Sequence, residues 1–218
     1  MSEPWAGPTD PGRAYAENYL AEDEVLTAAR QRGAEVGAGP IGPGGGAALR
    51  LLAAAIGARH VVEVGTGAGV SGLWLLRGMA LDGVLTSVDV EPEHQRLAKQ
   101  TFAEAGIAPA RARLITGRAL DVLPRLTDAA YDLVFFDGEK SEYADYLVEA
   151  MRLLRVGGIV AFDNALARNR VGEAGARDDY TVAVRELGKQ VRDDPRLVPA
   201  LLPVGDGLLA AVRLADPD

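Results

Sequence analysis

Residues 60–71 read His-Val-Val-Glu-Val-Gly-Thr-Gly-Ala-Gly-Val-Ser, and this stretch decides the fold class. The β-branched run at 60–64 predicts a short buried strand, and the glycine cluster after it predicts a tight turn that a ligand can approach closely. The apolar spacing of residues 70–79 predicts a helix that begins directly after the turn. A strand, a glycine turn and a helix in this order indicate an α/β sheet with a ligand at the helix N-terminus.

Strand and helix patterns alternate along the rest of the chain. The expected elements are strands at 83–90, 112–117, 131–137 and 157–164, helices at 92–106, 142–155 and 179–194, and a strand pair around a Gly-Asp-Gly turn within 196–214. Strands that alternate with helices predict a doubly wound parallel sheet covered on both faces. The short last connection predicts that at least one final strand runs antiparallel.

The N-terminal forty residues are expected to form a separate arm, followed by a single domain over 41–218. The first 12 or so residues are rich in Pro and Gly and are expected to be disordered. Residues 13–32 predict one helix, Gly37–Gly46 predicts a loop, and 48–56 predicts a buried helix. The arm could serve as a lid, as a dimer arm or as both.

Composition excludes several classes of site. The 218 residues include 31 acidic and 23 basic side chains, so the formal net charge is −8, which argues against a general nucleic-acid backbone binder. The chain has no cysteine, which excludes disulfides, thiolate metal sites and a cysteine nucleophile. No apolar run is long enough for a membrane span and the N-terminus lacks signal-peptide features, so we expect a cytoplasmic protein.

The acidic residues around the glycine turn limit which class of ligand could bind there. The glycines follow the spacing G-x-G-x-G, which is a poor match to the G-x-G-x-x-G of nicotinamide dinucleotide sites. Glu63 lies two positions before the first glycine, where it would repel a pyrophosphate but not a ligand that carries an ammonium and a sulfonium. Asp89 ends the second strand, 24 residues after Gly65, where a carboxylate can accept hydrogen bonds from both ribose hydroxyls.

Two further side chains have more than one interpretation. Ser71 stands at the helix start, where it could cap the helix or hold the carboxylate of an amino-acid ligand. His94 is expected on the surface of an amphipathic helix, and His60 on the opposite, amino edge of the sheet. A Ser-His-Asp triad therefore has no convincing histidine.

A second polar cluster follows the next two strands. Asp137 ends the strand at 131–137, and Asp163 and Asn164 end the strand at 157–164. Such residues are common turn formers, but two carboxylates and an amide oxygen on adjacent strands also suit Mg²⁺. Lys140 is either a solvated loop cation or a general base, and a lysine is notable in a chain that has only 3 lysines among 23 basic residues.

Taken together, these motifs resemble the small metal-dependent S-adenosylmethionine O-methyltransferases, the family of catechol, caffeoyl-CoA and related bacterial enzymes. The resemblance extends from Ile41 to Arg213 and rests on VVEVGTGAGVSGLWL, TSVDVEPEH, YDLVFFDGEKSEYADY, LLRVGGIVAFDNAL and LLPVGDGLLAAVR. It implies a Rossmann-like class I methyltransferase fold with a seven-stranded, mostly parallel sheet whose last strand is antiparallel. It also implies a homodimer.

The same resemblance implies the site residues. The residues that it implies for S-adenosylmethionine are Ile41, Glu63, Gly65, Thr66, Gly67, Gly69, Ser71, Asp89, Ala119 and Asp137. Within this set Asp89 is expected at the ribose, Ala119 beside the adenine and Ile41 over the cofactor. The implied metal ligands, for Mg²⁺ or another hard divalent cation, are Asp137, Asp163 and Asn164. The implied catalytic residues are Lys140, as the base, and Asp137.

The expected reaction is methyl transfer from S-adenosylmethionine to a hydroxyl of a small catechol-like vicinal diol, a hydroxylated aromatic compound. Two alternatives remain open. One is methylation of a hydroxylated tRNA uridine, for which four arginines could form a basic face: Arg111, Arg113, Arg118 and Arg125. The other is a non-catalytic protein that binds S-adenosylmethionine. No membrane partner is expected.

Overall fold

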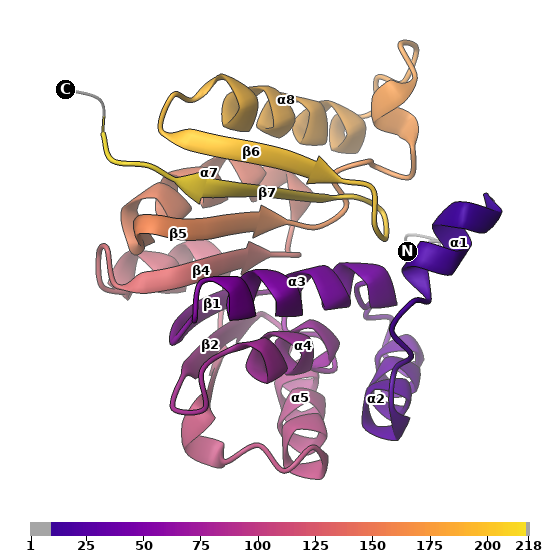
Figure 1. Ribbon diagram of the computed structural model, residues 1–218, viewed down its shortest axis with the longest axis vertical. Coiled ribbons are helices and arrows are strands. Elements are labelled where there is room, and N and C mark those ends of the chain that lie inside the picture. Colours follow the sequence, from indigo (N-terminus) through magenta and orange to yellow (C-terminus); the bar gives the residue numbers. More distant parts are fainter. Residues whose placement is uncertain (1–9, 217–218) are drawn as a thin grey trace.

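A single seven-stranded sheet forms the centre of the molecule in the computed structural model, which describes residues 10–216 (Figure 1). The strand order is β3-β2-β1-β4-β5-β7-β6. The strands are β1 (His60–Val64), β2 (Val84–Asp89), β3 (Ala112–Thr116), β4 (Tyr131–Phe136), β5 (Leu154–Phe162), β6 (Leu197–Leu202) and β7 (Leu208–Arg213). β7 runs antiparallel to both of its neighbours, β5 and β6, and the other strand pairs are parallel, so the predicted fold class is confirmed.

Helices cover both faces of the sheet. They are α1 (Pro11–Glu17), α2 (Glu24–Glu35), α3 (Pro43–Ala55), α4 (Val70–Gly78), α5 (Pro92–Glu104), α6 (Ala119–Val122), α7 (Tyr143–Leu153) and α8 (Asp179–Asp193). Apolar side chains of α2 to α5 pack in the core on one face, and those of α6 to α8 pack on the other. Figure 1 shows α3 in front of the sheet and α7 behind it. Among residues 10–216, no helix is both long and apolar enough to cross a membrane.

The strand order places the polar strand ends at one edge. β1 lies between β2 and β4, so the order reverses there, and this is the position where open α/β sheets bind ligands. Backbone hydrogen bonds continue past the strand ends, from Gly65 N to Val88 O, from Asp137 N to Val64 O, and from Asp163 N to Phe136 O. The residues that follow β1, β4 and β5 are therefore neighbours, as the alternating pattern predicted.

The N-terminal arm differs from the expectation of one helix over 13–32. It forms two helices, because Asn18 ends α1 and the Asp23 side chain caps α2 by accepting from Leu26 N at 3.0 Å. Residues 10–12 are also regular, since Asp10 caps α1 and Pro11 occupies its first turn. The rest of the segment expected to be disordered, residues 1–9, lies outside the described residues.

The expected glycine loop is shorter than Gly37–Gly46. α3 begins at Pro43, so Gly44, Gly45 and Gly46 are helical. Close packing explains these glycines: a Cβ on Gly46 would collide with the Trp74 indole, and one on Gly45 would lie 2.7 Å from Ile41 Cγ1. The loop prediction was wrong here because contacts with distant residues, rather than local helix propensity, select glycine.

Candidate active site

A fully buried carboxylate lies beneath the glycine loop. Glu63, on β1, accepts hydrogen bonds from Ser71 Oγ at its Oε1 and from Ser87 Oγ at its Oε2, both at 2.5 Å. Burial raises the pKa of Glu63 to about 7, and the two hydroxyls, which favour the ionised form, only partly offset the burial. Glu63 therefore contacts the site through Ser71 rather than through an exposed carboxylate.

A chain of hydrogen bonds connects this carboxylate to helix α5. The Ser87 hydroxyl donates to Glu63, so the Thr66 hydroxyl, 2.7 Å away, is the donor to Ser87 Oγ. Gln95 Nε2 in turn donates to Thr66 Oγ1 at 3.0 Å. Sequence reasoning missed Gln95, although a polar residue on the apolar face of an amphipathic helix is a signal for a buried polar contact. These bonds fix the conformation of the glycine loop.

The role of Ser71 as a helix cap is excluded. Gly69 is the N-cap of α4, with φ of 85°, and no side chain caps this helix. The Ser71 hydroxyl donates to Glu63 instead. Gly69 itself packs against α5, because a Cβ there would lie 3.0 to 3.1 Å from Ala98 and Phe102. Its role in this structure is close helix packing and a left-handed turn.

A hollow of about 120 Å³ lies above the glycine loop, between that loop and the segment that precedes α3. Seven of the residues predicted for the cofactor line it, namely Ile41, Gly65, Thr66, Gly67, Ser71, Asp89 and Asp137. Ala38, Gly39 and Pro40 complete the wall that Ile41 belongs to. The structure thus brings the N-terminal segment, the glycine loop and two strand-end carboxylates around one space.

Asp89 is held from three directions at the end of β2. Its Oδ2 accepts from Gly67 N at 3.0 Å and lies 3.1 Å from His94 Nδ1, and its Oδ1 accepts from Glu91 N at 3.0 Å. His94 was expected on the surface, but its side chain is only 18% exposed and lines the hollow. That expectation was wrong because the first turn of α5 folds back over the end of β2 and points His94 at Asp89.

A second hollow of about 330 Å³ continues from the first, since both include Gly65 and Asp89. Ala119, the residue expected beside the adenine, lines this hollow. Tyr146 lies in its wall and donates a hydrogen bond from its hydroxyl to Glu142 Oε2 at 2.7 Å. The two hollows form a groove along the carboxyl ends of β1 and β2, with Asp89 at their junction.

Asp137 and Lys140 form an ion pair at the end of β4. Lys140 Nζ donates to Asp137 Oδ1 at 2.7 Å, and the two side chains are 14% and 16% exposed. Burial alone would lower the pKa of Lys140, but the charges of Asp137 and Asp163 outweigh burial and raise it above its usual value. Asp137 also lines the hollow above the glycine loop, which we call the cofactor hollow after the residues expected there, so it connects this hollow to Lys140.

Asp163 and Asn164 lie next to this pair, at the end of β5. Asp163 is 4% exposed, and Asn164 Nδ2 donates to its Oδ2 at 3.2 Å. Burial and the charge of Asp137 raise the pKa of Asp163 well above its ordinary value. Between Asp10 and Asp216, no group of three or more His, Asp or Glu side chains is placed to hold a metal. The predicted set has only two carboxylates, buried Asp163 and partly exposed Asp137, and their mutual repulsion is consistent with a hard divalent cation between them.

Sequence reasoning missed two further titratable residues, Asp206 and Tyr180, whose pKa values the charge of Lys140 affects. Asp206, in the Gly-Asp-Gly turn between β6 and β7, is buried, and its Oδ1 accepts from Arg168 N at 2.7 Å. Burial raises the pKa of Asp206 and of Tyr180, at the start of α8, and the positive charge of Lys140 partly offsets burial at both groups. The turn was predicted only as a connection, because nothing local shows that its Asp points inward.

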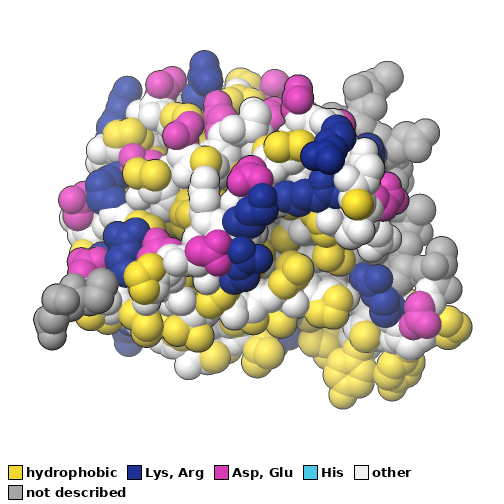
Figure 2. All heavy atoms as spheres, turned by 90° about the horizontal axis from the view of Figure 1, so that it is seen from above, with side chains coloured by type: hydrophobic (Ala, Val, Ile, Leu, Met, Phe, Trp, Pro, Cys, Tyr) yellow, Lys and Arg dark blue, Asp and Glu magenta, His cyan; other side chains and the backbone are white. Residues whose placement is uncertain are grey.

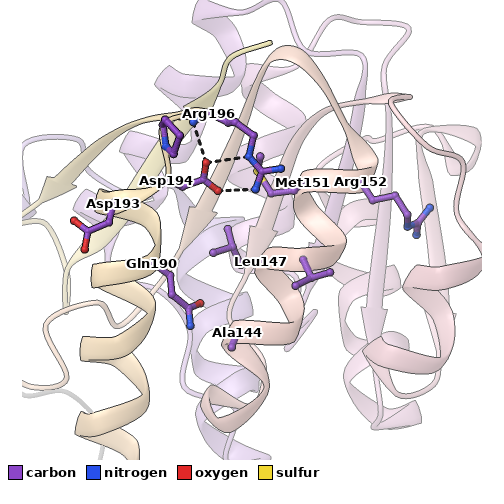
Figure 3. A pocket seen from close by; sticks show the side chains of 10 residues that line it. Ala144, Leu147, Met151, Arg152, Gln190, Asp193, Asp194 and Arg196 are labelled. Carbon is purple, nitrogen blue, oxygen red and sulfur yellow. Dashed lines mark hydrogen bonds and ion pairs between the residues drawn. The ribbon is translucent and has the colours of Figure 1, made fainter. Parts of the chain in front are cut away.

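A larger hollow than these two, of about 780 Å³, lies elsewhere, between α7 and α8 (Figure 3). Leu147 and Met151 contribute apolar lining, and both arginines of the lining are already paired, Arg196 with Asp194 and Arg152 with Glu149. None of the predicted site residues lines it. The groove at the sheet edge, which gathers titratable groups, is therefore the candidate active site.

The fold, the glycine loop and the acidic strand ends define the class of Rossmann-like methyltransferases. A family model described as O-methyltransferase matches residues 13–214. A Mycobacterium tuberculosis relative named "Probable O-methyltransferase" is 56% identical over 200 residues, which cover 92% of this chain and 89% of the relative. The chain therefore belongs to the O-methyltransferase family and is an enzyme of that class, which confirms the family that its motifs indicated.

Solved structures support this assignment. A Corynebacterium glutamicum protein of 33% identity has a TM-score of 0.86, and the match covers 94% of this chain and 96% of that one. The O-methyltransferase TomG from Streptomyces achromogenes, involved in tomaymycin synthesis and solved in complex with S-adenosylmethionine, is 29% identical with a TM-score of 0.83. That match covers 99% of this chain and 100% of TomG.

Proposed function

We propose that this enzyme transfers the methyl group of S-adenosylmethionine to one hydroxyl of a small catechol-like vicinal diol, with the help of a divalent cation. The observation that carries the proposal is the position of Asp137, which lines the cofactor hollow and pairs with Lys140 at 2.7 Å. The methyl donor and the proton acceptor would therefore meet at one strand end. TomG was solved in complex with S-adenosylmethionine, and its structure matches this chain over nearly the whole length of both proteins. This match supports the choice of donor.

The groove offers a place for each part of the donor. Asp89, at the junction of the two hollows, would accept hydrogen bonds from the ribose hydroxyls. Ala119 and the second hollow would receive the adenine, and the glycine loop with Ser71 would receive the methionine end. Ile41 would cover the donor from the arm side.

The metal ligands would be Asp137, Asp163 and Asn164. The first two are carboxylates at the ends of adjacent strands, and the third contributes an amide oxygen, all hard donors suited to Mg²⁺. When bound, the cation supplies positive charge that makes a chelating diol hydroxyl more acidic. The same charge would neutralise the repulsion between the two carboxylates.

Lys140 would act as the general base. Its ammonium lies 5.3 Å from the centroid of the buried Tyr143 ring and 2.7 Å from Asp137, so its position is fixed. The negative charges of Asp137 and Asp163 raise the pKa of Lys140, so the neutral amine would form once these charges are compensated, and it would then take the proton of the diol hydroxyl. The hydroxyl oxygen then forms a bond to the methyl carbon while the carbon–sulfur bond breaks, and the bonding pair stays on sulfur. The chain contributes mainly position and charge.

The test is a panel of catechols incubated with S-adenosylmethionine, with added Mg²⁺ or with a chelator, and read by mass spectrometry. We expect mono-methylated catechols only with the metal, and no product from matched monohydroxy compounds. Turnover that is unaffected by chelator would contradict the metal-dependent mechanism. Cofactor binding without methylation of any diol would favour the non-catalytic interpretation.

A further inference from the structure

Glu17, on α1, is a buried carboxylate for which the proposed reaction has no use. Its side chain reaches two distant backbone groups: Oε1 accepts from Gly44 N at 3.0 Å and Oε2 accepts from Gly205 N at 2.8 Å. The residue is 5% exposed. No arginine, lysine or histidine between positions 10 and 216 forms an ion pair with it. A buried anion that depends on two backbone N–H groups implies a specific docking contact.

The chain is shaped to receive this carboxylate. A Cβ on Gly42 would collide with Glu17 Oε1, and one on Gly44 would lie 2.5 Å from Oε2. Gly44 belongs to the first turn of α3, whose N–H groups lack partners within the helix and carry the positive end of its dipole. The glycines of this turn therefore form a cradle for Glu17.

The Gly44 side of the contact leads to the cofactor wall. The segment 38–41 enters α3 directly and lines the cofactor hollow. Arg30, on α2, donates to the backbone carbonyl of Ile41 at 2.9 Å. The arm thus holds this wall at two points, through Arg30 at Ile41 and through Glu17 at Gly44.

The Gly205 side leads to the loop after β5, residues 165–172, which follows the proposed metal ligands Asp163 and Asn164 and which we call the acceptor wall. The next residue after Gly205, Asp206, accepts from Arg168 N with its side chain at 2.7 Å and from Leu166 N with its carbonyl at 2.8 Å. The loop that it holds follows Asn164 and includes three successive non-glycine residues with φ of 46°, 57° and 67°, at 167–169. Such left-handed backbone is unfavourable for Ala167 and Arg168 and persists only where other contacts hold it.

We propose that Glu17 is a positioning residue that couples the N-terminal arm to both walls of the active site. In Figure 1 the β6–β7 turn lies beside α1 and the start of α3, where Glu17 joins the three elements. Docking of α1 fixes the segment over the cofactor and the turn that holds the loop after β5. This inference rests on the proposed function for its kinetic part only.

The coupling must be reciprocal. If Glu17 links the arm to the cofactor wall, cofactor binding stabilises the docked arm by the same free energy by which docking favours the cofactor. Amide exchange in α1 then reports on the cofactor hollow, although α1 does not line it. A residue that only stabilised the fold would not produce this dependence.

The experiment compares Glu17→Gln with Glu24→Gln, which removes the same charge from an exposed position on the arm. Hydrogen exchange of residues 11–17 is measured with and without S-adenosylhomocysteine, together with the cofactor Kd, the acceptor KM and kcat. In the wild type and in Glu24→Gln, the cofactor should slow exchange about tenfold. In Glu17→Gln this slowing should disappear, the Kd and KM should rise about tenfold, and kcat should change less than about threefold.

Cofactor-dependent slowing that persists in Glu17→Gln, or that is absent from the wild type, would overturn the proposal. So would a variant whose melting temperature falls while its Kd and KM stay unchanged. If Glu17→Gln does not fold, Glu17→Asp provides the same readouts with a charged but shorter side chain, and failure of both to fold would show a structural role only. If the wild type methylates no diol, the proposed function fails, while exchange and Kd still decide this inference.

Discussion

The residues that define the site are polar groups placed in a dry environment. Glu63, Asp163 and Asp206 are each less than a tenth exposed, and each sits within hydrogen bonds supplied by the fold. Burial raises the pKa of all three carboxyl groups. Several groups with shifted pKa values at one edge of a sheet are typical of an active site, because catalytic groups need pKa values that suit proton transfer or charge stabilisation.

Substitution of Lys140 tests the base. Lys140→Ala should lower kcat by about 10² to 10⁴, the usual contribution of a positioned general base, and should change the cofactor Kd by less than about threefold. The reason is that Lys140 lies at the acceptor side and does not line either hollow of the groove. Lys99→Ala, at an exposed position of α5, is the matched control. Equal losses in kcat and cofactor affinity would show that Lys140 only supports the fold.

Substitution of Glu63 tests the buried carboxylate through pH. Its pKa is about 7 in the fold against an ordinary 4.5, so the folded chain resists ionisation of this group. Its effect is absent below pH 4.5 or so, and stability is lost as pH rises toward 7, by about 3 kcal/mol in total. Glu63→Gln cannot ionise, so its melting temperature relative to that of the wild type, measured from about pH 5 to about pH 8, should rise with pH up to about pH 7 and then level off.

The control for this comparison is Glu24→Gln, in which an exposed carboxylate is removed. It should follow the wild-type pH dependence of the melting temperature. Parallel curves for Glu63→Gln and the wild type would refute the buried, hard-to-ionise state of Glu63.

At the scale of elements, α3 shows how packing overrides propensity. Glycine normally disfavours a helix interior, yet the first two turns of α3 contain three glycines. Each lies where a Cβ would meet another group: Glu17 at Gly44, Ile41 at Gly45 and the indole of Trp74 at Gly46. The glycines let the arm and α4 approach α3 closely, and this approach builds the wall of the cofactor hollow.

Two glycine substitutions separate propensity from packing. Gly46→Ala should destabilise the protein by about 1–3 kcal/mol, because overpacking against Trp74 outweighs the gain in helix propensity. Gly188→Ala, in α8, has no heavy atom within 4 Å of the new Cβ and should stabilise by about 0.5–1 kcal/mol. Urea unfolding measures both. A stabilised Gly46→Ala would show that the packing around Trp74 is looser than described.

The sequence predicted the sheet well and the arm poorly, for physical reasons. The strands are buried apolar runs bounded by glycine or by charged residues. The local pattern therefore predicted both ends of β1 correctly, at residues 60 and 64. The same logic located Asp89 and Asp137, because the carboxyl ends of parallel strands share an edge. Glu17, Gln95, His94 and Asp206 were not recognised, since each acts through partners distant in the chain or through a turn whose direction local sequence does not fix.

At the scale of the whole molecule, charge argues against a nucleic-acid substrate. The formal net charge is −8, and on the face over α8 basic and acidic side chains are interspersed (Figure 2). Two of the four arginines considered for tRNA binding already have partners within the protein. Arg111 donates to three backbone carbonyls, and Arg118 pairs with Glu142. Neither arginine is free to neutralise phosphates without losing these contacts.

A binding assay tests this conclusion. In an electrophoretic mobility assay at about 0.05 M salt, where phosphate contacts are strongest, we expect no shift of bulk tRNA. A basic RNA-binding domain is the positive control. A shift of tRNA that disappears as salt rises to about 0.2 M would instead favour the hydroxyuridine methyltransferase.

The most direct test of the proposed chemistry is a crystal structure with S-adenosylhomocysteine, a catechol and Mn²⁺ as an anomalous substitute for Mg²⁺. We expect one anomalous peak about 2 Å from side-chain oxygens of Asp137, Asp163 and Asn164, with both catechol oxygens on the same ion and Lys140 beside one of them. A metal-free site in which water separates these three side chains, or a catechol bound away from Lys140, would contradict it.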